Sequence, residues 1–378
     1  MTGSANREKA PDESAVSGDA PRRLLVALAA GGTGGHIFPA LAVAEELQAA
    51  GASVLLIGTG SELEARLLES SGVPYKSVPS VPVLGKGVRG IIHLLRILPG
   101  NLRTTARLLR NSGAGTVIAF GGYPSFFPVL AAAILGIPRV VHEQNVQAGV
   151  ANKVLSLLAT EVFAVHGVKG LWRRAKEIGN PVRRSFHEIP SWESPSERVR
   201  VLVLGGSQGA VSLNTAVLAN LTLLRELDIE LIHQVGTVDY ERVVEAYRSA
   251  AFPATVHKFI TDIAAEYSAA HLIVSRAGAM AVAEIAAARR PAIFVPLRIA
   301  SGHQAQNVRY LTGAGAARCL EQNDALATQL GGLLRELVTR PAELEQIAIR
   351  LQSLNAEQSL RAAEALAREG LRLAALHK

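Results

Sequence analysis

The order of apolar and polar residues divides the chain into short apolar runs and longer segments in which apolar residues recur at helical spacing. The short runs are typical of buried strands, and the longer segments are typical of helices that cover a sheet. In the first half, strands are predicted at 24–30, 53–58, 116–120, 138–142 and 161–165. Helices are predicted at 39–50, 61–71, 101–112, 124–135 and 148–158.

The second half repeats this alternation. Its predicted strands are 199–204, 230–234, 255–258, 271–275, 292–295 and 316–319. Its predicted helices are 210–224, 239–250, 261–269, 278–288, 303–313, 324–337 and 341–353, and a last helical pattern covers 356–375. Such alternation predicts parallel sheets with helices on both faces, which is an α/β fold.

Two predicted strands lead directly into glycine-rich turns, and a helix follows each turn. The first turn runs from Gly31 to His36, and the second runs from Gly205 to Ala210. Glycine lets the backbone bend tightly and approach a ligand closely. The N–H groups that begin a helix have no partner within it and suit a phosphate. One such unit in each half predicts two Rossmann-like parallel-sheet domains that face a central cleft.

The same pattern suggests where the domains begin and end. We expect an N-terminal domain at 22–185, a linker at 186–198 and a C-terminal domain at 199–355. Pro190 and Pro195 mark the linker. The polar residues 1–21 are expected to form a disordered tail without a secretory signal, and the final segment 356–378 fits either domain.

The composition fits two domains with substantial cores, since 49% of the 378 residues are hydrophobic and 19% are charged. The single cysteine, Cys319, excludes an internal disulfide and fits a reducing compartment. No apolar run approaches the roughly 20 residues of a membrane-spanning helix, so we expect a soluble or peripherally attached protein.

Positive charge is concentrated in one segment. Residues 70–142 contain no Asp or Glu. Their lysines and arginines are Lys76, Lys86, Arg89, Arg96, Arg103, Arg107, Arg110 and Arg139. A segment with charge of one sign favours an anionic partner.

In part of this segment, apolar residues also recur every three or four positions. The apolar residues at helical spacing are Ile91, Leu95, Leu98, Leu102, Ala106 and Leu109. Pro99 and Gly100 predict a break into two short helices. A basic amphipathic helix suits the surface of an anionic membrane, whereas the alternative is a helix that packs on the sheet with solvated arginines. Nucleic acid is a poorer partner, because only 4% of the residues are aromatic and no known binding motif is present.

The glycine-rich turns do not match the common nucleotide motifs. A dinucleotide motif read from Gly32 would need a third glycine where the chain has Ile37, and an acidic residue after the strand 53–58, which is absent. A P-loop would need Gly-Lys-Ser/Thr, which is also absent. A nicotinamide oxidoreductase and an ATP-binding enzyme are therefore disfavoured.

One carboxylate stands out in the second half. Glu284 lies in an otherwise apolar helix that follows the turn around Gly278. A buried carboxylate needs a specific partner, because a lone one is costly. A ribose diol would serve, and the alternative is a glutamate on the surface of the helix.

Seven strings occur in one order along most of the chain. They are Ala30 to Pro39, Gly121 to Tyr123, His142 to Asn145, Gly179 to Arg183, Gly205 to Ala210, Arg276 to Ala279, and His303-Gln304 with Asn307. In these strings the chain resembles the MurG family of transferases. That family adds N-acetylglucosamine to lipid I (undecaprenyl-pyrophosphoryl-N-acetylmuramyl-pentapeptide) and so makes lipid II of peptidoglycan.

The resemblance implies the GT-B fold, the donor UDP-GlcNAc, the acceptor lipid I and inversion at the transferred sugar. It also implies a peripheral protein on the cytoplasmic face of the inner membrane, in contact with its anionic surface. Related GT-B enzymes glycosylate other lipids such as diacylglycerol, and a catalytically silent scaffold that binds a UDP-sugar is a further alternative.

The resemblance assigns roles to matched positions. Thr33, Gly34 and Gly35 are expected at the donor and acceptor phosphates, and Arg183 and Ser207 at the diphosphate of the donor.

Further matched positions concern the sugar and the nucleoside of the donor. Asn145 and Gln304 are expected at the donor sugar, and the backbone of Ile260 at the uracil. The segment expected at phosphate and ribose is Ala279, Met280, Ala281, Val282, Ala283 and Glu284, with Glu284 on the ribose hydroxyls. The chain departs from the family at Ala281, where a hydroxyl residue is common, and at Gly302, where an acid is common.

Displacement at the anomeric carbon needs a base for the 4-hydroxyl of the acceptor and stabilisation of the departing UDP. We expect no metal and no cofactor, because the sequence has no Asp-x-Asp and no His/Asp/Glu cluster at ligand spacing. The helix starts after Gly206 and Gly278, together with Arg183, would take the charge of the leaving group. His36 is the favoured base, since its ordinary pKa near 6.5 suits proton abstraction at neutral pH. Glu143 is the alternative base, and either residue could instead have a structural role.

Overall fold

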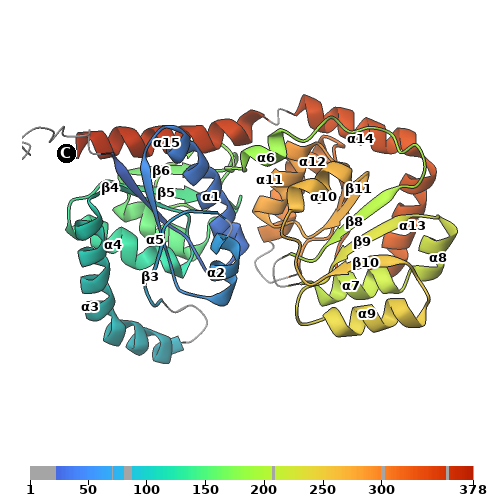
Figure 1. Ribbon diagram of the computed structural model, residues 1–378, viewed down its shortest axis with the longest axis horizontal. Coiled ribbons are helices and arrows are strands. Elements are labelled where there is room, and N and C mark those ends of the chain that lie inside the picture. The colour runs from blue at the N-terminus through green and yellow to red at the C-terminus, as the bar shows by residue number, and fades with distance from the viewer. Residues whose placement is uncertain are drawn as a thin grey trace, which may run out of the picture.

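The structure, a computed structural model, describes residues 23–69, 71–80, 87–206, 209–298, 303–354 and 357–377. Two α/β halves lie side by side, and each is built on its own parallel sheet (Figure 1). This arrangement confirms the predicted α/β fold with two Rossmann-like sheets. The tail predicted at 1–21 lies outside the described residues.

The N-terminal sheet has seven parallel strands in the order β3-β2-β1-β4-β5-β6-β7. The strands are β1 (Leu25–Ala29), β2 (Ser53–Gly58), β3 (Tyr75–Ser77), β4 (Ala114–Ala119), β5 (Arg139–Glu143), β6 (Glu161–Ala164) and β7 (Lys176–Glu177). The helices of this half are α1 (Gly34–Ala49), α2 (Glu62–Glu69), α3 (Gly87–Ser112), η1 (Tyr123–Ser125), α4 (Phe126–Ile134) and α5 (Val150–Leu158).

The C-terminal sheet has six parallel strands in the order β10-β9-β8-β11-β12-β13. The strands are β8 (Arg200–Leu204), β9 (Glu230–Gln234), β10 (Ala254–His257), β11 (Leu272–Ser275), β12 (Ala292–Phe294) and β13 (Arg318–Cys319). Its helices are α6 (Arg184–His187), α7 (Val211–Leu218), α8 (Leu221–Glu226), α9 (Tyr240–Ser249), α10 (Ile263–Ala269), α11 (Ala279–Ala288), α12 (His303–Gly313), α13 (Leu326–Thr339) and α14 (Pro341–Ser353).

Both faces of the sheets are buried, as parallel sheets require. In β1, Val26 and Leu28 point into a core shared with α1, whereas Ala27 and Ala29 point into a core shared with α4. This two-sided burial explains why the strands were recognisable as continuous apolar runs.

The last helix, α15 (Glu357–Leu376), returns from the C-terminal half and packs on the N-terminal sheet (Figure 1). It lies against α1 and β4. Leu366 and Leu373 are buried in the same core as Val26. At Gly370, a Cβ atom would lie 2.8 Å from Cδ1 of Ile118, so glycine lets the helix pack closely on β4.

The structure corrects several predicted elements. The helix predicted at 39–50 already begins at Gly34, which places the glycine-rich turn at the helix start itself. The helix predicted at 210–224 is two helices, α7 and α8, because the side chain of Asn220 donates to the carbonyl of Ala216 and to that of Ala327. The strands β3 and β7 were not predicted, since both are short and carry few apolar residues.

The predicted break at Pro99 is also wrong, since α3 runs through Pro99 from Gly87 to Ser112. Pro99 and Gly100 are exposed, so the proline ring lies on the solvent side of the helix. Among the described residues, no helix is long and apolar enough to cross a membrane.

Candidate active site

A cavity of about 780 Å³ lies between the two halves, at the carboxyl ends of strands from both sheets. We call it the central cavity. The predicted site residues that line it are Thr33, Gly34, Gly35, His36, Asn145, Ile260, Ala279, Met280, Ala281, Glu284 and Gln304. The predicted residues Glu143, Arg183, Val282 and Ala283 do not line it, and Ser207 and Gly302 lie outside the described residues.

His36 enters the cavity from the first turn of α1. Its Nδ1 lies 3.2 Å from the carbonyl oxygen of Gly31 and 3.3 Å from Oγ1 of Thr33. A carbonyl only accepts hydrogen bonds, so the bond to Gly31 places the imidazole proton on Nδ1. Nε2 then carries a lone pair, and burial lowers the pKa of His36. The ring is therefore set up as a neutral proton acceptor.

Glu143, the alternative base, is engaged on both oxygens. Oε1 accepts the backbone N–H of Asn145 at 2.8 Å, and Oε2 accepts the backbone N–H of Gly149 at 3.0 Å. The side-chain amide of Asn152 also donates to Oε2 at 2.9 Å. With 2% exposure, Glu143 holds the loop that presents Asn145, and this geometry favours His36 as the base.

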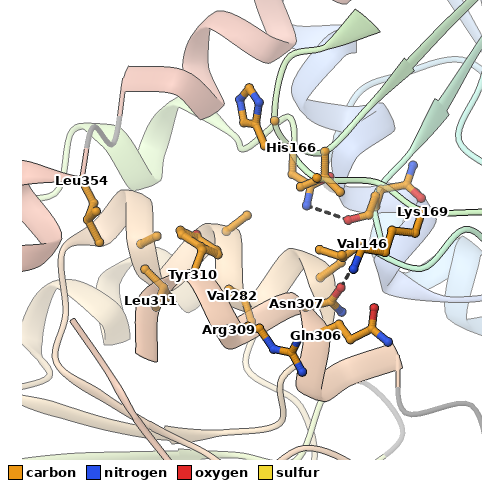
Figure 2. Close-up of a pocket in the computed structure, with 18 of the residues that line it drawn as sticks. Val146, His166, Lys169, Val282, Gln306, Asn307, Arg309, Tyr310, Leu311 and Leu354 are labelled. Carbon is orange, nitrogen blue, oxygen red and sulfur yellow. Dashed lines mark hydrogen bonds between the residues drawn. The ribbon is translucent and has the colours of Figure 1, made fainter. Parts of the chain in front are cut away.

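Asn307 joins this loop to the other half of the molecule. Its Oδ1 accepts the backbone N–H of Val146 at 3.1 Å, and its Nδ2 donates to Oδ1 of Asn145 and to the carbonyl of Ala277, each at 3.3 Å. Figure 2 shows Asn307 reaching from the C-terminal half toward Val146. Asn307 was part of a family string, but no pattern in the sequence indicated that it would bridge the two halves.

The start of α11 forms the wall opposite His36. Gly278 precedes the helix, and the first intrahelical bond in this turn is donated by Val282 to Gly278. The N–H groups of Ala279, Met280 and Ala281 are therefore the unpaired donors of the helix start. They carry the positive end of the helix dipole toward the cavity.

Glu284, one turn further along α11, is 7% exposed and lines the same cavity. No other described residue donates a hydrogen bond to its carboxyl group. Burial raises the pKa of Glu284 to about 7, against the opposing effect of the Arg183 charge. A buried carboxyl group without a protein partner that faces a cavity is suited to a polar ligand.

Val282 and Ala283 lie on the other face of α11 and line a second cavity of about 500 Å³. Figure 2 shows Val282, Tyr310 and Leu311 around this space. The two faces of α11 thus serve different cavities, and the structure does not bring Val282 and Ala283 to the predicted phosphate site.

Arg183 lies beside the central cavity, on the wall of a smaller cavity of about 250 Å³. Its guanidinium lies 4.9 Å from the ring centre of Phe38 and 5.0 Å from that of Phe186. Its Nε and Nη2 are buried without a hydrogen-bond partner among the described residues. Its charge reaches Glu284, but a direct contact with a diphosphate in the central cavity would require the side chain to move.

Gln234 is a lining residue that sequence reasoning missed. Its Oε1 accepts the backbone N–H of Ile260 at 3.0 Å, and its Nε2 donates to the carbonyl of Gly206 at 3.1 Å. Gln234 therefore ties the second glycine-rich turn to the backbone expected at the uracil. Its signal in the sequence was its place at the end of β9, next to the turn after β8.

Arg276 is another missed lining residue, just before α11. Its guanidinium donates to the carbonyl of Val295 at 3.0 Å and to Oγ of Ser212 at 2.6 Å, and burial lowers its pKa. On the same wall, Gln304 accepts the backbone N–H of Leu297 at 2.9 Å through Oε1. No group of three His, Cys, Asp or Glu side chains within the described part of the chain has an arrangement that would hold a metal ion.

Two parallel-sheet halves that present glycine-rich turns and helix starts to one cavity have the GT-B arrangement, and family models that match both halves identify the chain as a glycosyltransferase. The model of the glycosyltransferase family 28 N-terminal domain matches residues 26–164, and that of the C-terminal domain matches residues 200–364.

Individual relatives show which branch of this glycosyltransferase family the chain resembles. The UDP-N-acetylglucosamine–N-acetylmuramyl-(pentapeptide) pyrophosphoryl-undecaprenol N-acetylglucosamine transferase of Nitratidesulfovibrio vulgaris (strain DP4) is 41% identical over 334 residues, which cover 86% of this chain and 91% of that protein. The transferase of the same name from Solidesulfovibrio magneticus is 38% identical and covers 92% of this chain and 97% of that protein. The crystal structure of Acinetobacter baumannii MurG superposes with a TM-score of 0.70 at 30% identity, covering 92% and 99% of the two chains. The chain belongs to the MurG family of N-acetylglucosamine transferases.

Proposed function

We propose that this protein transfers N-acetylglucosamine from UDP-GlcNAc to the 4-hydroxyl of the N-acetylmuramyl unit of lipid I and so forms lipid II. The observation that carries the proposal is the pairing, across one cavity, of a neutral His36 with a free Nε2 and a helix start that carries the unpartnered Glu284. Relatives with the corresponding name are 38% to 41% identical to this chain over the aligned residues.

The donor would lie on the C-terminal half, within the domain that we place at 199–355. The N–H groups at the start of α11 suit its diphosphate, because they offer donors and the positive end of a dipole. Glu284 would accept the hydroxyls of the ribose, and the backbone around Ile260 would meet the uracil. Asn145 and Gln304 line the cavity from opposite halves and would hold the sugar between them.

The acceptor would lie on the N-terminal half, at 22–185, with its pyrophosphate near Thr33, Gly34 and Gly35. In the reaction, the 4-oxygen of the acceptor forms a bond to the anomeric carbon as the bond from that carbon to UDP breaks. The proton of the 4-hydroxyl passes to Nε2 of His36. The departing UDP takes the electron pair, and the helix start of α11 stabilises the added negative charge.

The lipid-linked acceptor would bring the protein to the cytoplasmic face of the inner membrane. On α3, Arg96, Arg103 and Arg107 are exposed and form no ion pair with another described residue. Leu98, Leu102 and Ala106 instead pack toward the core, and Leu109 is buried. Contact with an anionic membrane through this part of α3 would therefore rest on charge rather than on insertion of its apolar face.

A comparison of acceptors tests the proposal. Labelled UDP-GlcNAc is offered with a soluble lipid I analogue or with diacylglycerol in the same detergent. We expect label in the lipid I product alone. Transfer to diacylglycerol instead would assign another lipid as the acceptor, and donor binding without transfer to either would favour the non-catalytic scaffold.

A further inference from the structure

Glu64, near the start of α2, is a buried carboxylate with no part in the reaction as described so far. Its side chain is inaccessible to solvent, at 0% exposure. Oε1 accepts the backbone N–H of Gly32 at 2.8 Å and the hydroxyl of Thr59 at 2.6 Å. Oε2 accepts the N–H groups of Thr59 at 2.7 Å and Gly60 at 2.9 Å, and the hydroxyl of Tyr75 at 2.6 Å.

The surroundings of this carboxylate are built to hold it as an anion. Burial opposes ionisation, but hydrogen bonds from Thr59, Tyr75, Gly32 and Gly60 together outweigh it and hold the pKa of Glu64 below its ordinary value. A Cβ atom at Gly31 would lie 2.4 Å from Oε1, and one at Gly58 would lie 2.5 Å from Oε2. Glycine at the ends of β1 and β2 thus makes room for the carboxylate.

The link to His36 runs through a single peptide group. The N–H of Gly32 and the carbonyl of Gly31 belong to the same peptide unit, and the described backbone contains no cis peptide bond. In a trans unit these two groups point in opposite directions. Glu64 holds the N–H end at 2.8 Å, and the carbonyl end receives Nδ1 of His36 at 3.2 Å.

This arrangement has two effects. It fixes the orientation of the carbonyl that sets the tautomer and direction of the imidazole. An N–H group bound to a carboxylate also makes the carbonyl of the same peptide a stronger acceptor, because hydrogen bonds in a chain polarise one another. The chain of hydrogen bonds from the Glu64 carboxylate through the peptide unit to the imidazole therefore stabilises the tautomer with the proton on Nδ1 and leaves Nε2 without a proton.

We propose that Glu64 is the positioning residue of His36 and acts on it through the peptide unit between Gly31 and Gly32. This inference rests on the proposed role of His36 as the base for the acceptor hydroxyl. Glu64 also takes the N–H of Gly32 away from the cavity, so that a ligand meets the N–H groups of Thr33, Gly34 and Gly35 instead.

The variant Glu64→Gln tests the link. Three donors surround the position of Oε2, so the carboxamide oxygen is expected there and the NH₂ group is expected to face the N–H of Gly32. The bond to the peptide unit would be lost with little change in side-chain shape. Tyr75→Phe is the matched control, because it removes a buried hydrogen bond to Oε2 and leaves the bond between Oε1 and Gly32 intact.

Two readouts are needed. In the transfer assay, we expect Glu64→Gln to lower kcat by roughly tenfold to 10²-fold, as a displaced catalytic group does, with the Kd of UDP-GlcNAc unchanged by calorimetry. Tyr75→Phe should keep kcat near that of the unaltered protein. Nitrogen NMR of labelled histidine, with the signal of His36 identified by its loss in His36→Ala, should show the Nδ1–H tautomer in the unaltered protein and in Tyr75→Phe but not in Glu64→Gln. The charge of Glu143 also acts on His36, and Glu143 is unchanged in all of these variants. A difference between them therefore does not come from Glu143.

The inference is overturned if folded Glu64→Gln keeps both its kcat and the Nδ1–H tautomer, or if Tyr75→Phe loses as much activity as Glu64→Gln. Should Glu64→Gln not fold, an Nε2–H tautomer in the unaltered protein would overturn it equally. The NMR readout needs no substrate. A protein with the expected tautomer but without transfer to lipid I would therefore contradict the proposed function and leave the positioning role standing.

Discussion

His36 and Glu284 both line the central cavity, and burial shifts each of them toward its neutral form. It lowers the pKa of His36 and raises that of Glu284 to about 7. In the proposed reaction, the neutral form of His36 is the proton acceptor. For Glu284 the ionised form is the better partner for two ribose hydroxyls, so donor binding should draw it toward the carboxylate.

The base role predicts that His36→Ala lowers kcat by about 10²–10⁴-fold, the usual contribution of general base catalysis. The Kd of UDP-GlcNAc, measured by calorimetry, should change little. In the unaltered protein, kcat/KM for the acceptor should fall as the pH is lowered, with a midpoint below the ordinary histidine value of 6.5, because burial lowers the pKa of His36. Near-normal turnover of His36→Ala would show that another group takes the proton.

The ribose role predicts a pH-dependent donor affinity. At pH 8, Glu284→Gln should weaken UDP-GlcNAc binding by about 1.5 kcal/mol or more, roughly tenfold in Kd, because a hydrogen-bonded charge is lost. In the unaltered protein the affinity should fall as the pH drops through about 7, where Glu284 takes up a proton. Calorimetry between pH 6 and pH 8 measures both effects. The same pH slope in Glu284→Gln would rule out Glu284 as its source.

Among single residues, those beside a recognisable local pattern were predictable. His36 ends a glycine-rich turn, and Glu284 is a lone acid in an apolar helix. Gln234, Asn307 and Glu64 were not predicted, because their partners are remote in sequence and only the packing brings them together. The bond from Gly32 to Glu64, for example, spans 32 positions.

Helix α11 shows how one element serves two environments. Its first turn and Glu284 face the central cavity, whereas Val282 and Ala283 face the second cavity. The matched residues 279–284 therefore lie on two faces of the helix. Only the face toward the central cavity is placed to contact the donor proposed there.

Helix α3 shows what the spacing of apolar residues in a sequence does not reveal. The period at 98–109 correctly indicated a helix with one apolar face, but an apolar face alone does not say what covers it. In the structure the described apolar residues of this stretch pack toward the core. The continuous helix through Pro99 also shows that one proline can be accommodated where its side of the helix is exposed.

For α3 we predict that replacing Arg96, Arg103 and Arg107 by Gln weakens binding to phosphatidylglycerol vesicles by about 10²-fold, since each arginine near an anionic surface contributes about 1 kcal/mol. Sedimentation at two salt concentrations measures this. The triple Lys variant is the charge-preserving control, and transfer to a soluble lipid I analogue should be unchanged in both. If vesicle binding changed neither with salt concentration nor with the Gln substitutions, α3 would not be the membrane contact.

At the scale of the whole molecule, the two sheets and their parallel order followed from the alternation of strands and helices. The relation between the halves did not, because it depends on contacts such as those of Asn307 with Asn145 and Val146. The return of α15 to the N-terminal sheet was likewise undetermined, since its apolar face would suit either core. These contacts close one cavity between the two halves, and neither half holds both His36 and the unpartnered Glu284.

In the proposed reaction, the central cavity joins N-acetylglucosamine to lipid I without a metal ion. The most direct measurement is transfer from labelled UDP-GlcNAc to a soluble lipid I analogue in the presence of EDTA, with the linkage of the product determined by NMR. We predict a β1→4-linked product at the rate seen without EDTA. Loss of transfer in EDTA, a different linkage, or binding of UDP-GlcNAc without any product would show that the proposed reaction is wrong.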